Sequence, residues 1–125
     1  MERLRVFFSW NCSPLWLENK EEKIYDEVFV DEVVRDIPEL GKYPELFKRL
    51  FEAQKIYDDL FIDTPKVFEY KGFDDPKEEE VFYQEVYSVV QEIKEKLKEG
   101  YTVSDEIDYP IYLMEKHGWV NDFWG

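Results

Sequence analysis

The chain has 125 residues, which is enough for one domain with its own hydrophobic core and too few for two. Its 30 acidic and 16 basic side chains leave a net charge of −14, which disfavours direct binding to nucleic acid phosphates or to an anionic membrane surface. Hydrophobic content of 44% and aromatic content of 18% exclude an acidic disordered tail, because such tails are poor in aromatic residues. We therefore expect a single acidic domain over residues 1–125.

The cysteine count and the first residues favour the cytoplasm. Cys12 is the one cysteine of the chain, so an internal disulfide is excluded, whereas small secreted domains usually carry even sets of cysteines. The apolar run that follows Met1 is broken within a few positions, unlike the apolar region of a signal peptide. No stretch approaches the roughly 18 apolar residues that a membrane span needs. We expect a cytoplasmic protein that binds no membrane.

The first third of the chain indicates short extended segments. Residues 4–10 are mostly apolar, rich in aromatic side chains, and predict a buried or half-buried strand, which the turn-forming residues 11–14 end. Residues 15–17 form a short apolar patch. A second strand or extended segment is expected around residues 28–30, followed by a turn of helix or a loop up to Pro38.

Two long helices are expected in the middle of the chain. The first begins at Pro44, because proline is tolerated at the first helical position, and should end near Phe61. Its apolar stripe consists of Leu46, Leu50, Ala53, Tyr57 and Leu60.

The second helix has signals at both ends. Asp75 is placed as the N-cap before Pro76, and glutamates fill the first turn. Lysines occupy the last turns, and Gly100 provides the stop. The apolar stripe of this helix consists of Phe82, Val86, Val89, Ile93 and Leu97.

The last quarter of the chain completes the expected fold. Residues 101–103 read as a strand that shares one sheet with residues 4–10, and residues 111–113 could add a further strand. The aromatic side chains of residues 119–125 favour a tail packed on the domain. We predict an α+β fold, with a small β-sheet covered on one face by two long helices.

Residues able to carry chemistry are few. Cys12 and His117 could pair only if the ends of the chain meet, and nothing that flanks them supports a catalytic role. One histidine and one cysteine cannot make a zinc site. The carboxylates at 58–63 and 74–75 lack the spacing of a calcium loop. We expect the first group on a solvated surface and the second group in the cap of a helix. We predict no catalytic site, no cofactor and no metal.

The negative charge is unevenly distributed. Residues 18–39 hold nine acidic and three basic side chains, a local net charge of −6, and residues 74–99 hold nine and four, a net of −5. Acids on a helix are more often a solvated face, so 74–99 favours solubility. In 18–39, aromatic side chains alternate with the acids, as on a surface that steers and anchors a basic partner. The candidate partner-binding residues are Trp16, Tyr25, Asp26, Glu27, Phe29, Asp31 and Glu32.

Several motifs resemble one protein family. The sequences RVFF at 5–8 and SPLWLE at 13–18, with Leu15-Trp16-Leu17 the strongest piece, resemble the opening of a group of small acidic bacterial proteins. Further matches are Ala53-Gln54, Tyr57-Asp58 and residues 100–103. The group has an Asn/Asp-Trp-acid segment where this chain has FIDTP at 61–65. These proteins look like immunity proteins, which neutralise bacterial toxins; the resemblance implies a small non-enzymatic binding domain and assigns no functional residue.

Charge and resemblance together define the leading hypothesis and its rivals. We expect a non-enzymatic immunity protein or antitoxin whose partner is a basic, nuclease-type cognate toxin and which covers that toxin's functional surface. The same charge also suits a nucleic-acid mimic that inhibits a DNA-binding enzyme. An enzyme of unknown class is the third alternative, and it requires a cleft that gathers His117, Cys12 or a buried pair of acids.

Overall fold

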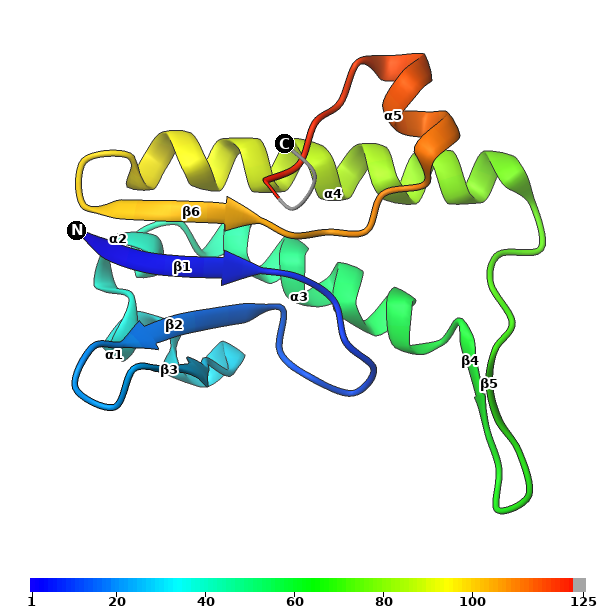
Figure 1. The fold of residues 1–125 in the computed structure, drawn as a ribbon, viewed down its shortest axis with the longest axis horizontal. Helices are drawn as coiled ribbons and strands as arrows, with labels where there is room; N and C mark the ends of the chain where they lie inside the picture. Colours follow the sequence, from blue (N-terminus) through cyan, green and yellow to red (C-terminus); the bar gives the residue numbers. More distant parts are fainter. Residues whose placement is uncertain (123–125) are drawn as a thin grey trace.

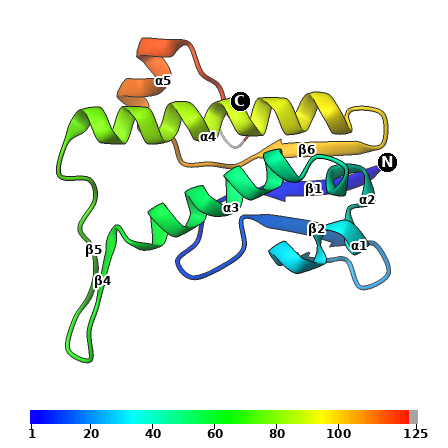
Figure 2. The ribbon, with the colours of Figure 1, turned by 180° about the vertical axis from the view of Figure 1, so that it is seen from behind.

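A computed structural model describes residues 1–122 (Figure 1). In this part of the chain, a mixed four-stranded sheet has the strand order β3-β2-β1-β6. Its strands are β1 (Glu2–Val6), β2 (Leu15–Asn19), β3 (Ile24–Glu27) and β6 (Tyr101–Asp105). Two long helices, α3 (Pro44–Asp58) and α4 (Pro76–Leu97), lie across one face of the sheet (Figures 1 and 2). The predicted α+β class, with two long helices on one face, is confirmed.

The sheet places its first strand, β1, beside its last strand, β6. β1 pairs in parallel with β6, with Leu4 opposite Val103, and in antiparallel fashion with β2, with Leu4 opposite Leu17. The prediction that the segments near residues 4 and 101 share one sheet is therefore confirmed. Leu4 and Val6 are fully buried against the helices, so Arg5 between them points to the opposite, open face.

The strand limits differ from those predicted. β1 begins at Glu2 and ends at Val6. Phe7 still donates its backbone N–H to Pro14 O (3.2 Å), but the chain then leaves the sheet and enters a loop. The apolar patch at residues 15–17 is part of β2. The strand expected at 28–30 lies earlier, at Ile24–Glu27. Lys23, with a positive φ of 59°, ends the turn that connects β2 to this strand.

The segment after β3 turns into short helices. These are the 3-10 turn η1 (Val30–Glu32), α1 (Val33–Asp36) and α2 (Pro38–Gly41). They agree with the expected turn of helix before Pro38 and correct the strand expected at 28–30. Val33, Ile37 and Leu40 are buried, at intervals of four and three residues rather than the two of a strand, which is the spacing of one helix face.

Both long helices begin where the sequence indicated. α3 starts at Pro44 and ends at Asp58, three residues before the expected end, because Leu60 N already turns back to Tyr57 O (3.0 Å). α4 starts at Pro76, and its N-cap Asp75 accepts a hydrogen bond from Lys77 N (2.8 Å). This cap is confirmed.

A β-hairpin that the sequence did not indicate joins these helices. It consists of β4 (Phe61–Asp63) and β5 (Phe68–Tyr70), with Phe61 opposite Tyr70. The hairpin projects away from the body of the molecule beyond the ends of α3 and α4 (Figure 1). Val67, Phe68 and Tyr70 are exposed along it, so little apolar burial marks these strands.

The strand expected at residues 111–113 is wrong, since this segment begins α5 (Ile111–His117). Ile111 and Tyr112 are exposed, whereas Leu113 is fully buried. This pattern leaves two neighbouring apolar side chains in water, as a short surface helix does. Gly118, with φ of 69°, ends the helix in the left-handed region that glycine adopts without strain.

The tail that follows α5 packs on α4 as far as it is described. The Trp119 ring stacks on Tyr87, with centroids 5.0 Å apart, and contacts Tyr109 at 5.6 Å. Phe123 and Trp124, which were expected to pack as well, lie outside the described residues. Across residues 1–122, no helix combines the length and the apolar character needed to cross a membrane.

Candidate partner-binding surface

The open face of the sheet carries an arginine held between two rings. The guanidinium of Arg5 donates to both carboxylate oxygens of Glu106, at 2.8 and 2.7 Å. It also lies 5.0 Å from the ring centroids of both Phe7 and Tyr25. The hydrogen bonds from Arg5 hold the pKa of Glu106 below its usual range. The Phe7 ring stacks on Trp16 at 5.2 Å, so two predicted anchors, Trp16 and Tyr25, join one array.

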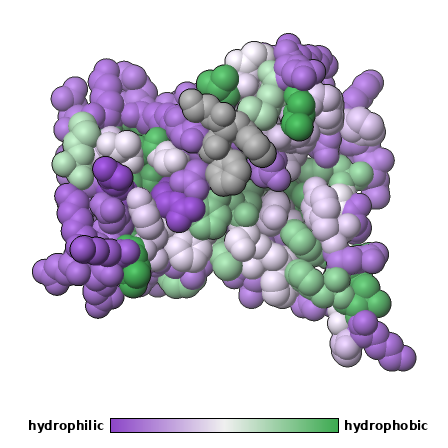
Figure 3. Space-filling model, viewed as in Figure 1, coloured by the Kyte–Doolittle hydropathy of each residue, from purple (hydrophilic) through white to green (hydrophobic). Residues whose placement is uncertain are grey.

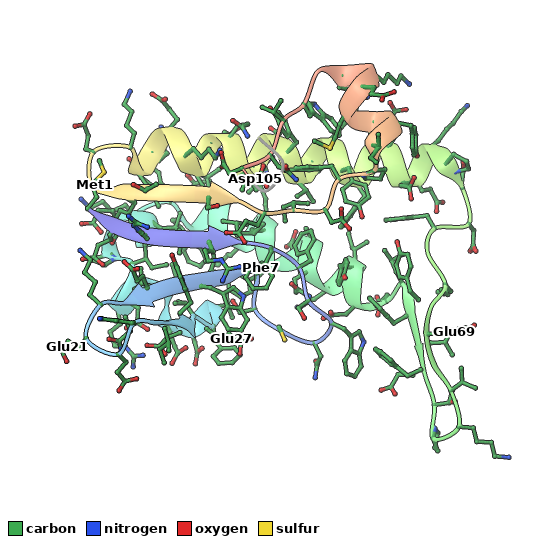
Figure 4. The ribbon with its side chains drawn as sticks, viewed as in Figure 1. Met1, Phe7, Glu21, Glu27, Glu69 and Asp105 are labelled. Atoms are coloured by element: carbon green, nitrogen blue, oxygen red, sulfur yellow. The ribbon has the colours of Figure 1, made fainter. Side chains whose placement is uncertain are left out.

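The predicted acids do not form one cluster. Glu27 shares the open face with Tyr25, whereas Asp26 points the other way, because successive side chains of β3 alternate. Figure 4 shows Phe7 and Glu27 toward the same end of the sheet. Asp31 and Glu32 lie beyond the strand, on η1. The candidate residues therefore do not share one face: three lie on the open face, Asp26 lies on the other side of β3, and the rest lie at η1.

Several of these acids also hold the chain in place. Glu27 accepts a hydrogen bond from Ser13 N, and Asp26 accepts one from the Asn19 amide at 3.3 Å. Glu32 accepts from Phe29 N at 3.0 Å and pairs with Arg35 at 3.1 Å. Within residues 1–122, Asp31 has no such hydrogen bond or ion pair. Its charge is thus the most available of the four.

The predicted residues on η1 border a shallow depression. Phe29, Asp31 and Glu32 line it together with Cys12 and Phe51. Phe29 is 49% exposed, which is much for a phenylalanine and leaves its ring available for contact.

A deeper cleft, which the sequence did not indicate, lies at the end of the sheet next to the hairpin. Its volume is about 660 Å³. Five segments supply its walls: the end of β1 with its loop, the end of α3, the hairpin, the first turns of α4 and residues 106–111. The lining residues used below are Arg5, Phe7, Phe8, Tyr57, Phe61, Tyr70, Glu79, Tyr83, Glu106, Asp108 and Tyr109.

One wall of this aromatic cleft is a continuous row of rings. Phe8 stacks on Tyr57 at 5.2 Å, Tyr57 meets Phe61 at 5.3 Å, and Phe61 meets Tyr70 at 5.1 Å. Tyr70 is 52% exposed. In Figure 3, apolar side chains continue along the projecting hairpin and give way to hydrophilic ones at its tip. The row therefore leads from the interior of the cleft out onto the hairpin.

Carboxylates face these rings. Burial raises the pKa of Tyr70, and the charges of Glu79 and Asp108 raise it further. The same two acids add to the effect of burial on Tyr83. Asp108 is exposed, while Glu79 accepts a hydrogen bond from the Tyr112 hydroxyl. The carboxylates thus give the aromatic cleft a negative electrostatic potential, and its phenols stay protonated at neutral pH.

The two residues considered for nucleophilic catalysis lie in separate environments. His117 Nε2 lies 2.6 Å from Glu80 Oε2, and its ring stacks on Trp119 at 4.6 Å. Cys12 is half-buried in the depression beside Phe51. In the described part of the chain, no hydrogen bond joins Cys12 to His117, and the contacts of His117 are with Glu80 and Trp119.

Two of the acids considered for metal binding, Asp58 and Asp75, have structural contacts. Asp58, expected on a solvated surface, is instead half-buried and accepts from Asn11 N (2.7 Å) and from the Gln54 amide (2.8 Å). These bonds tie the loop after β1 to α3. Asp75 caps α4. A search of residues 1–122 finds no group of three or more metal-ligating side chains.

Fold and surface together describe a small acidic α+β domain whose sheet is open on one face and ends at an aromatic cleft. Residues 2–105 match the model of the Serratia CdiI immunity protein-like family, and the chain belongs to this family. The match runs from β1 to the end of β6 and stops before α5. A search among curated proteins gave no match. The resemblance to immunity proteins is confirmed, and the family indicates a toxin-neutralising role through binding of a cognate toxin; such families are generally non-enzymatic.

Proposed function

We propose that this chain is a non-enzymatic cytoplasmic immunity protein that neutralises a basic, nuclease-type toxin by covering its functional surface. The observation that carries the proposal is the family match over residues 2–105. The net charge of −14 supports a basic partner, because a nuclease needs cations to hold its nucleic acid and opposite charge speeds association.

The proposed contact surface consists of the seven residues predicted from the sequence. Asp31 lacks a hydrogen-bond or ion-pair partner within residues 1–122, and Asp26, five residues earlier on β3, is exposed. Phe29, at 49% exposure, supplies apolar area. Trp16 and Tyr25 are half-buried on the open face. The carboxylates orient the toxin, and the rings provide the anchoring contacts.

Charge reversal tests this surface. The double variant Asp26→Lys/Asp31→Lys should bind the cognate toxin at least about tenfold more weakly in low salt. Its affinity should also depend less on salt. The control Glu99→Lys/Glu115→Lys alters two exposed acids elsewhere, and both variants carry −10 (−14 plus 4).

Isothermal titration calorimetry at two salt concentrations provides the measurement, and a growth assay with co-expressed toxin provides the functional readout. Equal losses of affinity in the two double variants would show that total charge, not the proposed contact surface, governs binding. Absence of any binding or protection by the unmodified chain would refute the toxin-neutralising role itself.

A further inference from the structure

We propose that the aromatic cleft is a binding pocket for an arginine side chain of the protein partner. This proposal rests on the proposed function, because it assigns a contact to the same kind of partner. It concerns residues outside the seven candidates and a different part of the surface.

The walls of the cleft suit a planar cation. Tyr57, Phe61 and Tyr70 form a row with centroid spacings of 5.3 and 5.1 Å. The face of an aromatic ring attracts a cation, and a guanidinium can stack flat against it. Tyr83 lies farther inside, buried at 5% exposure. A side chain that enters along the hairpin therefore meets ring surface along its length.

The chain itself displays this mode of binding at the border of the cleft. Arg5 lies over the rings of Phe7 and Tyr25 while it donates twice to Glu106. Three of these residues, Arg5, Phe7 and Glu106, line the cleft. The cleft offers a second set of the same groups, rings plus the carboxylates of Glu79 and Asp108, and Arg5, the one cation among its described lining residues, is already paired with Glu106.

The charges of the lining leave an excess of two carboxylates. The charged residues of the lining are Arg5, Glu79, Glu106 and Asp108. Arg5 and Glu106 neutralise each other through their paired hydrogen bonds. Asp108 is exposed and has no hydrogen bond or ion pair within residues 1–122, and Glu79 accepts a hydrogen bond from the neutral Tyr112 hydroxyl. The remaining charge is complementary to a guanidinium.

Other occupants fit the lining less well. A nucleic acid phosphate or an acidic peptide would face Glu79 and Asp108 and be repelled. An apolar side chain would bring no positive charge to Glu79 and Asp108. A lysine ammonium is a strongly hydrated point charge, whereas the guanidinium offers a flat face to the rings and several donors to the two acids.

A small probe tests the pocket without the toxin. Titration of the ¹⁵N-labelled chain in low salt with N-acetyl-arginine methylamide should give saturable NMR shifts at residues 106–111, the hairpin and the first turns of α4. The citrulline analogue has nearly the same shape but no charge, and it should bind at least about tenfold more weakly.

Matched variants identify the groups responsible. Asp108→Asn removes one exposed charge in the cleft and should weaken binding of the arginine probe at least about threefold. Tyr70→Leu removes a ring face and should weaken it similarly. Glu99→Gln removes one exposed charge just beyond the far end of α4, which spans about 27 Å from Glu79 to Leu97 at 1.5 Å per residue, and should leave binding unchanged.

The opposing outcomes are distinct. Equal affinity for the arginine and citrulline probes would overturn the proposal in favour of a neutral ligand. Shifts spread over the surface, with equal losses in Asp108→Asn and Glu99→Gln, would reduce it to diffuse attraction. If the probe binds specifically but Asp108→Asn leaves the affinity for the toxin unchanged, the pocket binds arginine but is not a contact site for the toxin. Because the probe needs no toxin, a failure of the proposed function leaves the probe result readable by itself.

Discussion

At the scale of single residues, Asp105 is the most unusual group of the molecule. It lies at the end of β6 with 0% of its surface exposed. Its carboxylate accepts hydrogen bonds from Ile107 N (3.1 Å) and the Tyr109 hydroxyl (2.9 Å), while its backbone N–H donates to Asp122 (2.7 Å). Burial raises the pKa of Asp105 to about 6, from an ordinary value of 3.8. A charge at this site therefore opposes folding.

This shift predicts a pH-dependent gain from Asp105→Asn. The folded state binds the proton more tightly than the unfolded chain, so the contribution of Asp105 to stability falls as pH rises from about 4 to about 6. The loss is on the order of 2–3 kcal/mol. An amide is never charged: its oxygen can accept from Ile107 N, and its NH2 can donate to the Tyr109 hydroxyl oxygen, which reverses the direction of that bond. The variant should therefore gain stability over the unmodified chain at pH 7.5 and lose most of that gain near pH 4.

Urea unfolding at both pH values measures the difference. Acids with lowered pKa values, such as Glu106 and Asp122, have the opposite pH dependence, but they are present in both proteins and cancel in the comparison. If the variant and the unmodified chain differ in unfolding free energy by the same amount at both pH values, the fold does not raise the pKa of Asp105.

At the scale of elements, the start of α4 provides a matched pair of acids. Asp75 accepts a hydrogen bond from Lys77 N, whereas its neighbour Asp74, also exposed, has no such bond within residues 1–122. Asp75→Ala should lower the free energy of unfolding by about 1 kcal/mol, the usual loss of an N-cap. Asp74→Ala should change it by less than about 0.5 kcal/mol. Thermal or urea unfolding tests this, and equal effects would contradict a specific cap.

The two long helices could be predicted from the sequence because their signals are local. Pro44 and Asp75 mark the starts, and stripes such as Phe82 to Leu97 mark the buried faces. β3 lacks such a signal, since the open face lets it carry charged and aromatic residues instead of an apolar alternation. Ile111 and Tyr112 are exposed on α5, so their apolar character indicated a strand that does not exist.

The site was less predictable than the fold. Trp16 and Tyr25 were found because they stand near a run of acids in the sequence. Phe7, Tyr70 and Asp108 meet in the aromatic cleft from segments that lie far apart in the chain. The shared sheet of residues 4–10 and 101–103 could be predicted, but the hairpin that brings Tyr70 to the cleft leaves no pattern that neighbouring residues reveal.

At the scale of the whole molecule, shape and charge both depart from a compact neutral domain. The chain exposes 7927 Å², against about 7,100 Å² expected for a folded monomer of its mass. The projecting hairpin is consistent with this excess. Its 30 acidic side chains outnumber the 16 basic ones, so repulsion between surface charges opposes the folded state.

Salt should therefore stabilise the free protein. An increase in NaCl from about 0.02 to 0.3 M shortens the Debye length to below 10 Å and screens repulsion more than it weakens the scattered ion pairs. The melting temperature should rise by a few degrees in differential scanning calorimetry. The Glu99→Lys/Glu115→Lys variant, with less charge, should show a smaller rise. A melting temperature that falls with salt would mean that the ion pairs dominate.

The pairing of β1 with β6 has a consequence for synthesis on the ribosome. β1 is a central strand of the sheet, and its parallel neighbour, with Tyr101 opposite Glu2, is made about a hundred residues later. Until that segment has left the exit tunnel, Leu4 and Val6 have no completed sheet to join. The domain should therefore fold only after translation of this segment, in one cooperative step of high contact order. A chain released before residue 101 would lack the strand that holds its first strand in place, and quality control would treat it as unfolded.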